Sequence, residues 1–260
     1  MAKRSKKWRV VALCVLLGMG ALGYWAWHRI NGPATKFTEE NRVLYIATGA
    51  DFQRVVDSLK KLEAITDEES FRFLCERKKY PQRIRPGRYR IARGMSMNAL
   101  VNMLRAGEQE PVRVTFSNID HLPELAGRLG RSLEPDSIAF LQAFLDPSLQ
   151  EKAGLSSETV ISLFIPNTYE FWWTTTPAGF IERMRLEHED FWDQERRQKA
   201  RAHGLSPAEV ATLASIVQAE TMKAVDAPQI AGVYLNRLRI GMPLQADPTL
   251  KFALGLDTVN

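Results

Sequence analysis

The sequence predicts an α+β protein with a single N-terminal transmembrane helix and a mainly helical C-terminal half. Three features of the 260 residues indicate this class. An uncharged apolar run fills residues 10–27, alternating runs are interleaved with helical periodicity over residues 41–116, and helical periodicity dominates residues 117–260. The composition, with 45% hydrophobic and 25% charged residues, excludes disordered and collagen-like classes.

The N-terminal segment is predicted to anchor the chain in a membrane. As a helix, residues 10–27 span about 27 Å, which is close to the thickness of a hydrocarbon core. The preceding tail, residues 1–9, is basic and should stay in the cytoplasm, which directs the remaining chain outward. We therefore expect a transmembrane anchor at residues 10–28 and a polar linker at residues 29–40. The alternative is a cleaved signal peptide with a weak small-residue site at residues 21–23.

The net charge of +5 belongs to the basic tail alone. Residues 1–9 contain five basic and no acidic side chains, so residues 10–260 have no net charge. Proteins that bind nucleic acid usually carry basic side chains across a folded face. We therefore expect no nucleic-acid partner.

The sequence also lacks cofactor motifs. Cys14 and Cys75 are too few for a disulfide framework or a thiolate metal site, and the four histidines are scattered. The chain has no Gly-rich phosphate loop ending in Lys-Ser/Thr, no paired-histidine zinc signature and no GxSxG elbow. We therefore expect neither a metal nor another cofactor.

Residues 41–116 are predicted to form a small α+β module. The expected order is strand, helix, helix, strand, helix and strand, at residues 43–46, 52–59, 71–75, 89–91, 97–104 and 112–116. Asp51 is placed to cap the first of these helices, and Gly107 is placed to end the third. We expect this module to fold independently.

Residues 117–260 are predicted to be mainly helical, with one exception. Apolar stripes at helical spacing occur at residues 122–129, 138–145 and 181–192. Between the last two stripes, residues 163–173 are rich in aromatic side chains and lack a helical period, which favours a strand or an ordered loop. Tyr169, Trp172 and Trp173 in this segment are either core residues or platforms that stack on sugar rings.

One helix of this region carries the best candidate for a catalytic acid. Residues 206–209 form a helix start with a serine cap and a capping box. Glu220 follows the apolar positions in residues 213–217 at helical spacing, so we expect it on the apolar face. A carboxylate is costly to ionise there and can act as an acid near neutral pH. The alternative is a surface Glu220 that pairs with Lys223.

Polar residues closer to the end of the chain have an ordinary structural interpretation. A further helix is expected over residues 226–238, followed by a turn. Gln245, Asp247 and Thr249 fit turn and capping positions before a last short helix. Residues 236–237 fit the solvated end of the preceding helix. None of these signals identifies an enzyme by itself.

Two strings in the C-terminal region resemble a known family. Residues 213–221 read LASIVQAET, and residues 233–249 read VYLNRLRIGMPLQADPT. These strings resemble the endolytic lytic transglycosylases of the MltG (YceG-like) family, which cut nascent peptidoglycan strands. The PNTY string at residues 166–169 resembles an upstream motif of the family, and RPGRYR at residues 85–90 resembles its LysM-like module.

The resemblance implies a LysM-like module at residues 41–116 and a YceG-like catalytic domain at residues 117–260. It places the family's catalytic glutamate at Glu220, while Gln218 replaces an acid that the family often has. The candidates for lining the substrate cleft are Asn167, Tyr169, Gln218, Asn236, Gln245, Asp247 and Thr249. Family members continue beyond the position of Asn260, so the catalytic domain is expected to be C-terminally incomplete here, and an extended version is expected to be more active.

A lytic transglycosylase needs only one carboxyl group, whereas ordinary glycosidases pair two. The resemblance implies that Glu220 protonates the departing glycosidic oxygen and then removes the proton of the sugar's 6-hydroxyl group. This reaction cleaves the bond between N-acetylmuramic acid and N-acetylglucosamine and leaves a 1,6-anhydro end. The alternatives are an inactive peptidoglycan-binding or division-complex scaffold, and a hydrolytic muramidase that also uses Asp247.

The implied partners are peptidoglycan glycan strands, together with cell-wall synthases where cleavage terminates polymerisation. The implied location is the inner (cytoplasmic) membrane, which the chain would cross once through its one helix. The N-terminus would be cytoplasmic, and the catalytic domain would be periplasmic or extracellular.

Overall fold

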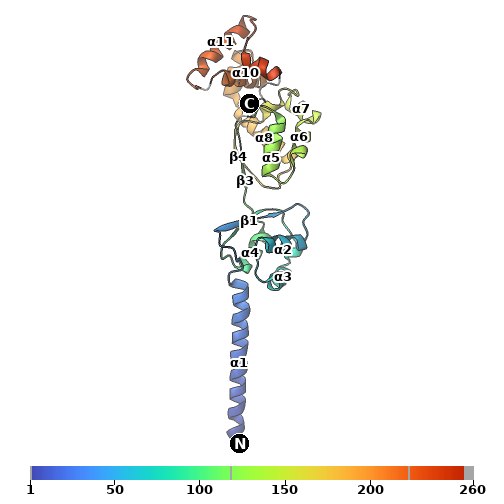
Figure 1. Ribbon diagram of the computed structural model, residues 1–260, viewed down its shortest axis with the longest axis vertical. Helices are drawn as coiled ribbons and strands as arrows, with labels where there is room; N and C mark the ends of the chain where they lie inside the picture. Colours follow the sequence, from blue (N-terminus) through green and yellow to red (C-terminus); the bar gives the residue numbers. More distant parts are fainter. Residues whose placement is uncertain (1, 118, 222, 255–260) are drawn as a thin grey trace. The chain divides into compact units, whose positions relative to one another are not determined.

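The computed structural model describes residues 2–117, 119–221 and 223–254. In this part of the chain helices dominate and strands are short, which confirms an α+β protein with mainly helical content (Figure 1). The first elements are α1 (Ala2–Asn31), β1 (Asn41–Ile46), α2 (Phe52–Lys61), α3 (Glu68–Arg77), η1 (Tyr80–Gln82), β2 (Gly87–Ala92), α4 (Met97–Ala106) and β3 (Val112–Phe116). The later elements are α5 (Leu122–Ser132), α6 (Ser137–Phe144), α7 (Pro147–Ala153), η2 (Val160–Leu163), β4 (Asn167–Phe171), α8 (Pro177–Phe191), α9 (Gln194–Ala202), α10 (Pro207–Glu220), α11 (Ala227–Arg239) and α12 (Asp247–Ala253).

The N-terminal segment is one continuous helix, α1, of 30 residues (Figure 1). Across the described residues, no helix combines the length and the apolar character that a membrane crossing requires. The prediction of a transmembrane helix at residues 10–28 is therefore corrected. From residue 18 onwards, three glycines together with Tyr24 and Trp27 interrupt the aliphatic side chains of this helix. These amphipathic rings transfer to hydrocarbon less favourably than aliphatic side chains do.

Two compact units divide the chain. The first contains the residues up to 114 together with two short later segments, 132–134 and 169–175. The second contains residues 115–131, residues 135–168 and the chain from residue 176 onwards. The chain thus returns twice to the first unit after leaving it. The predicted functional division between residues 116 and 117 stays a prediction.

In the first unit, β1 and β2 form an antiparallel pair in which Leu44 lies opposite Tyr89. Because side chains alternate along a strand, Leu44, Ile46, Tyr89 and Ile91 all lie on the buried face. Apolar side chains of α2, α3 and α4 complete this core. The carboxylate of Asp51 accepts a hydrogen bond of 2.8 Å from the backbone of the first turn of α2, which confirms the predicted cap.

The predicted linker at residues 29–40 contributes to the same core. Ala34 and Phe37 are both buried in it. The backbone N–H of Ala34 donates a hydrogen bond of 3.0 Å to the carbonyl oxygen of Met95, just before α4. The apolar side chains that stabilise the first unit therefore begin before β1.

Two later segments are attached to the end of β1 by specific contacts. The carboxylate of Glu134 accepts hydrogen bonds from the backbone N–H and the hydroxyl group of Thr48, each 2.6 Å long. The rings of Trp173 and Tyr45 have centroids 5.0 Å apart. The backbone N–H of Glu134 donates a hydrogen bond of 2.8 Å to the carbonyl oxygen of Trp173, which ties the two segments to each other.

The second unit has an aromatic core. Phe140 and Phe144 of α6 and Phe180 of α8 are fully buried, and the centroid of Phe180 lies 5.9 Å from each of the other two. Ile138, a member of the predicted stripe on this helix, is exposed instead, because α6 turns its two phenylalanines inward. β4 pairs with β3, so the segment at residues 163–173 contains the predicted strand.

A smaller apolar cluster joins the last three helices and supports the candidate site. It contains Leu213 and Val217 of α10, Tyr234 of α11 and Ala246 directly before α12. The capping box predicted at residues 206–209 is present at the start of α10. The helix that carries Glu220 is therefore fixed at its start by the cap and along one face by apolar packing.

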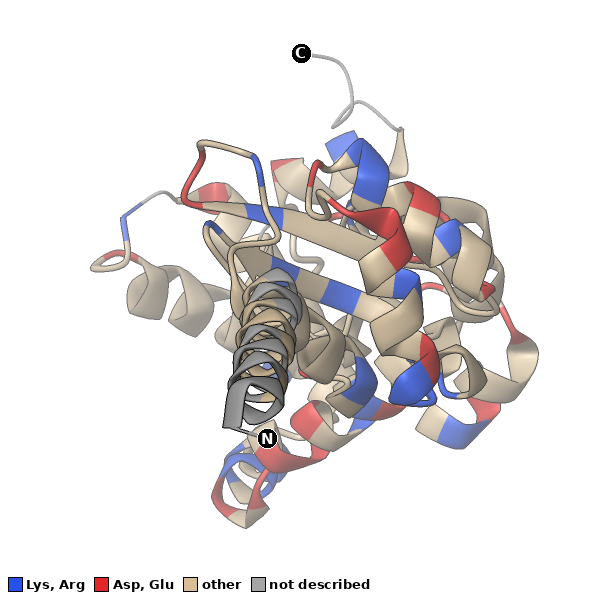
Figure 2. Cartoon of the chain, turned by 90° about the horizontal axis from the view of Figure 1, so that it is seen from below, with Lys and Arg blue, Asp and Glu red and all other residues tan. Residues whose placement is uncertain are grey.

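Positions of basic and of acidic residues are interspersed along the helices (Figure 2). On α8, Arg185 pairs with Glu182 and Glu189, and Arg183 pairs with Glu187. These pairs lie three or four residues apart, where side chains of a helix are neighbours. They give α8 a solvent-exposed face of mixed charge, while Phe180 and Met184 of the same helix are buried.

Candidate active site

Glu220 is the last residue of α10. Leu213 and Val217 are buried, which confirms the predicted apolar face of this helix. Glu220 itself is exposed, so the predicted burial of its side chain is wrong. The reason is that Thr221 has an extended backbone (φ −144°, ψ 138°), which ends the helix and its apolar face together. A carboxylate at this end faces the negative pole of the helix dipole.

The predicted alternative for Glu220, a surface ion pair with Lys223, is not formed. Among the residues that the structure describes, no salt bridge joins these two side chains. The backbone N–H of Lys223 donates a hydrogen bond of 3.0 Å to the hydroxyl oxygen of Thr221. The chain therefore turns away from α10 directly after Glu220.

Tyr234 of α11 is the hydrogen-bond partner of Glu220. Its hydroxyl group donates a hydrogen bond of 2.8 Å to Oε1 of Glu220. The residue is only 7% exposed, because it packs in the cluster formed by α10 and α11. Desolvation, and then the hydrogen bond to Glu220, raise the pKa of Tyr234 above its ordinary value. The tyrosine therefore stays protonated and acts as a donor at neutral pH.

The end of α11 shapes the opposite wall of the site. Gly241 has a left-handed backbone (φ +69°), and the N–H of Met242 donates a hydrogen bond of 2.8 Å to the carbonyl oxygen of Arg237. This is the Schellman arrangement, in which a glycine ends a helix without steric cost. Nη1 of Arg237 donates to the carbonyl oxygen of Leu244. The chain after α11 is therefore folded back onto the helix that precedes it.

Gln245 and Asp247 follow this fold-back. Gln245 has a left-handed backbone (φ +53°), which costs a non-glycine residue about 1 kcal/mol. Asp247 lies in the first turn of α12, where the helix dipole favours a carboxylate. Ala246 occupies the N-cap position, so neither Asp247 nor Thr249 caps the helix, in contrast to the prediction. The hydroxyl group of Thr249 donates a hydrogen bond of 2.6 Å to the carbonyl oxygen of Ala246.

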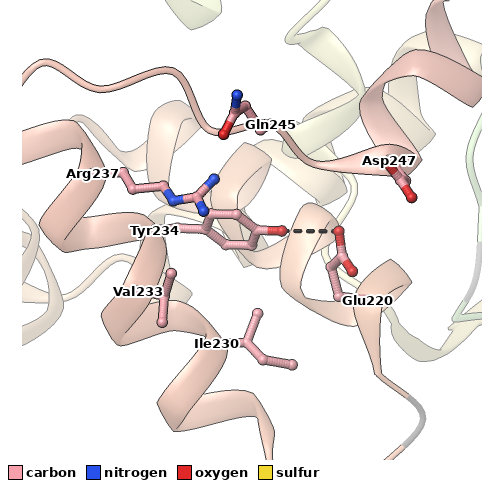
Figure 3. Close-up of a pocket in the computed structure, with 7 residues that line it drawn as sticks. All are labelled: Glu220, Ile230, Val233, Tyr234, Arg237, Gln245 and Asp247. Carbon is pink, nitrogen blue, oxygen red and sulfur yellow. Dashed lines mark hydrogen bonds between the residues drawn. The ribbon is translucent and has the colours of Figure 1, made fainter.

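An open pocket of about 300 Å³ lies between these elements (Figure 3). Its lining residues are Glu220, Ile230, Val233, Tyr234, Arg237, Gln245 and Asp247. Figure 3 shows Gln245 and Asp247 on the segment that faces α11 and the end of α10. The pocket thus brings together three residues that the sequence singled out, Glu220, Gln245 and Asp247.

The other predicted site residues lie outside this lining set of described residues. Gln218 and Asn236 are exposed on α10 and α11. Asn167 is exposed at the start of β4, where its side-chain oxygen accepts a hydrogen bond of 2.8 Å from the next backbone N–H. Tyr169 of the same strand is buried, and Trp172 beyond it is exposed.

Tyr234 and Arg237 are the polar lining residues that sequence reasoning missed. The pattern carried a signal, because Ile230, Val233, Tyr234 and Arg237 recur at spacings of three and four residues along one helix. The first three fitted an apolar stripe, and Arg237 fitted a solvated helix end. Only the return of the chain through Leu244 turns this stripe into the wall of a pocket.

Comparisons with known proteins agree with one another. The model of the YceG-like family matches residues 44–259. The chain is 23% identical over 238 residues to the endolytic murein transglycosylase of Bacillus subtilis, covering 86% of this chain and 66% of that protein. It is 26% identical over 236 residues to the endolytic murein transglycosylase of Streptococcus pneumoniae, covering 81% and 42%. The chain therefore spans less than two thirds of the length of these curated relatives.

A solved structure is also similar to this chain. The crystal structure of a YceG-like protein from Listeria monocytogenes aligns with a TM-score of 0.49 at 21% sequence identity. The alignment covers 83% of this chain and 76% of that one.

Proposed function

Because this chain belongs to the YceG-like family, we propose that it is an endolytic peptidoglycan lytic transglycosylase with Glu220 as its catalytic acid and base. Its curated relatives carry the name endolytic murein transglycosylase. The observation that supports the assignment of Glu220 is the pocket at the end of α10. There the carboxyl group of Glu220 is exposed and accepts a hydrogen bond from Tyr234.

The proposed reaction uses one carboxyl group twice. The protonated carboxyl group of Glu220 gives its proton to the glycosidic oxygen while the bond from this oxygen to C1 of N-acetylmuramic acid breaks. The resulting carboxylate then takes the proton of the 6-hydroxyl group of the same sugar, and O6 bonds to C1. The proton returns to Glu220, and the product has a 1,6-anhydro end. No water is consumed.

The position of Glu220 supports both halves of this cycle. Glu220 is the last residue of α10, and its carboxyl group lines the same pocket as that of Asp247. The hydroxyl group of Tyr234 donates a hydrogen bond to this carboxyl group, and Arg237 lines the same pocket. The carboxyl group of Glu220 is therefore open to a substrate and lies beside a hydrogen-bond donor, as proton transfer to and from a sugar requires.

The other polar lining residues are proposed to bind the sugar. Gln245 offers both a donor and acceptors, which suits the N-acetyl and hydroxyl groups of the substrate. Ile230 and Val233 offer apolar surface on the same wall. Asn167, Tyr169, Gln218, Asn236 and Thr249 remain candidates for contacts to sugars further along the strand.

We further propose that residues 41–116 act as a LysM-like module that binds glycan strands. The order β1, α2, α3, β2 with antiparallel β1 and β2 supports this assignment. The proposed substrate lies outside the cytoplasm, so the pocket is proposed to act in the periplasm or at the cell exterior. Cell-wall synthases are proposed as functional partners, because cleavage within nascent strands acts on their product.

Product analysis tests the proposed function. The protein is incubated with purified, uncrosslinked glycan strands, and the new chain ends are identified by mass spectrometry. We expect 1,6-anhydro-N-acetylmuramic ends at internal cleavage sites. New reducing ends would contradict the transglycosylase reaction, and binding without cleavage would favour a scaffold.

One observation favours a second candidate function, a hydrolytic muramidase. Asp247 lines the same pocket as Glu220 and provides the second carboxyl group that hydrolysis requires. In that case Asp247→Asn would abolish the release of reducing ends. In the transglycosylase reaction the same variant is expected to keep the anhydro product, because no second carboxylate takes part in proton transfer.

A further inference from the structure

The two oxygen atoms of the Glu220 carboxyl group have different surroundings. Oε1 accepts the hydrogen bond from Tyr234 at 2.8 Å. Among the described residues, Oε2 has no hydrogen-bond partner, and Figure 3 shows it pointing away from the tyrosine. In the proposed reaction one of these two oxygen atoms must reach the glycosidic bond.

We propose that Tyr234 is a positioning residue that holds Oε1 of Glu220, so that Oε2 is the oxygen that transfers the proton. This inference rests on the proposed function and deepens it. An oxygen that already accepts a hydrogen bond is the less available of the two for a proton. The other oxygen is therefore the one that meets the substrate.

Tyr234 is suited to this task because its own position is fixed. Its ring packs among Leu213, Val217 and Ala246, and a tyrosine has only two side-chain torsions. Glu220 is exposed and has three such torsions, so without a partner its carboxyl group would occupy several rotamers. The hydrogen bond therefore holds the carboxyl group of Glu220 against the packed side chain of Tyr234 on α11.

Burial and the hydrogen bond to Glu220 keep the tyrosine a neutral donor. Glu220 from α10, Arg237 from its own helix and Asp247 from α12 act on its hydroxyl group. Desolvation is the largest cause that raises the pKa of Tyr234, and the bond to Glu220 follows. The backbone N–H of Lys223, which follows α10, donates its hydrogen bond to the hydroxyl oxygen of Thr221. The hydroxyl group thus keeps its proton at neutral pH.

The first test needs no enzymatic activity. Tyr234→Phe, Glu220→Ala and the double variant are made in the full chain, and their unfolding midpoints in urea are compared with that of the parent. A hydrogen-bonded pair makes the two effects non-additive, so the double variant should be less destabilised than the sum of the single variants. Additive effects would overturn the inference.

The second test measures turnover of purified glycan strands. Tyr234→Phe keeps the ring and the packing, so KM should stay within about twofold, while kcat should fall about tenfold through loss of one hydrogen bond to a charged group. The matched control is Ser215→Ala, which removes another side-chain hydroxyl group, one that donates a hydrogen bond of 2.8 Å to the carbonyl oxygen of Thr212 on α10. Its kcat should equal that of the parent.

The two tests separate this inference from the proposed function. If the parent releases no anhydro ends, the proposed function fails, while the urea experiment still tests the pair of Tyr234 and Glu220. If the parent is active and Tyr234→Phe keeps its kcat, the positioning role is wrong and the proposed function stands.

Discussion

Arg237 lines the pocket and joins α11 to the segment that follows it through one hydrogen bond. Its guanidinium group donates to the carbonyl oxygen of Leu244 and so supports the strained backbone of Gln245. We expect Arg237→Ala to destabilise the protein by about 1 kcal/mol, because a partly buried hydrogen bond is lost. The same change should weaken glycan binding, because Gln245 is no longer held at the pocket.

The matched control is Arg239→Ala, two residues further along α11, where the side chain is exposed. This variant should unfold within about 0.5 kcal/mol of the parent, as ordinary surface changes do. The measurement is urea denaturation combined with binding of glycan strands in the Glu220→Gln background, where no cleavage interferes. Equal behaviour of the two arginine variants would contradict the role of Arg237.

At the scale of a single element, α10 depends on its capping box. The hydroxyl group of Ser206 accepts a hydrogen bond of 3.3 Å from the backbone of Glu209, whose carboxylate accepts one of 2.7 Å from the backbone of Ser206. We expect Ser206→Ala to lower the free energy of unfolding by about 1 kcal/mol, as is usual for the loss of an N-cap. Ser215→Ala, in the middle of the same helix, is the control and should be close to neutral.

The same cap predicts a dependence on pH. Hydrogen bonds from the backbone and then the hydroxyl group of Ser206 hold the pKa of Glu209 below its ordinary value. A lowered pKa in the folded state stabilises the protein above the pKa of the unfolded chain, and this stabilisation is lost as the pH falls through the folded value. The stability difference between the parent and Glu209→Gln should therefore be present at pH 7 and shrink towards pH 3. A difference that stays constant with pH would show that the carboxylate adds nothing to the cap.

Local patterns in the sequence predicted the elements well, and tertiary contacts account for the rest. The caps at Asp51 and Ser206 and the apolar face of α10 depend on neighbouring residues, so spacing alone identified them. The exposure of Glu220 depends on where α10 ends, which no spacing rule specifies. The roles of Tyr234 and Arg237 depend on the fold-back of the chain, a contact that the pattern of a single helix does not contain.

At the scale of the whole molecule, the first unit begins earlier than its strands. Phe37 is 4% exposed and belongs to the same core as β1 and β2, so a fragment that starts at residue 41 loses this side chain. Burial of a phenylalanine stabilises by about 2 kcal/mol. We therefore expect the fragment 31–116 to melt cooperatively and about 10 °C above the fragment 41–116. Calorimetry of both fragments checks this, and equal melting temperatures would show that Phe37 contributes nothing to the core.

The product yield of Glu220→Gln on purified glycan strands tests the catalytic role of Glu220 most directly. Glutamine keeps the size of the side chain and can still accept the hydrogen bond from Tyr234, so the variant should melt like the parent. Its amide group has no acidic proton to give to the glycosidic oxygen, and general acid–base catalysis contributes about 10²- to 10⁴-fold. We predict a fall in anhydro-muramyl ends at or beyond the upper end of that range, measured by mass spectrometry. A yield near that of the parent would remove Glu220 from the mechanism.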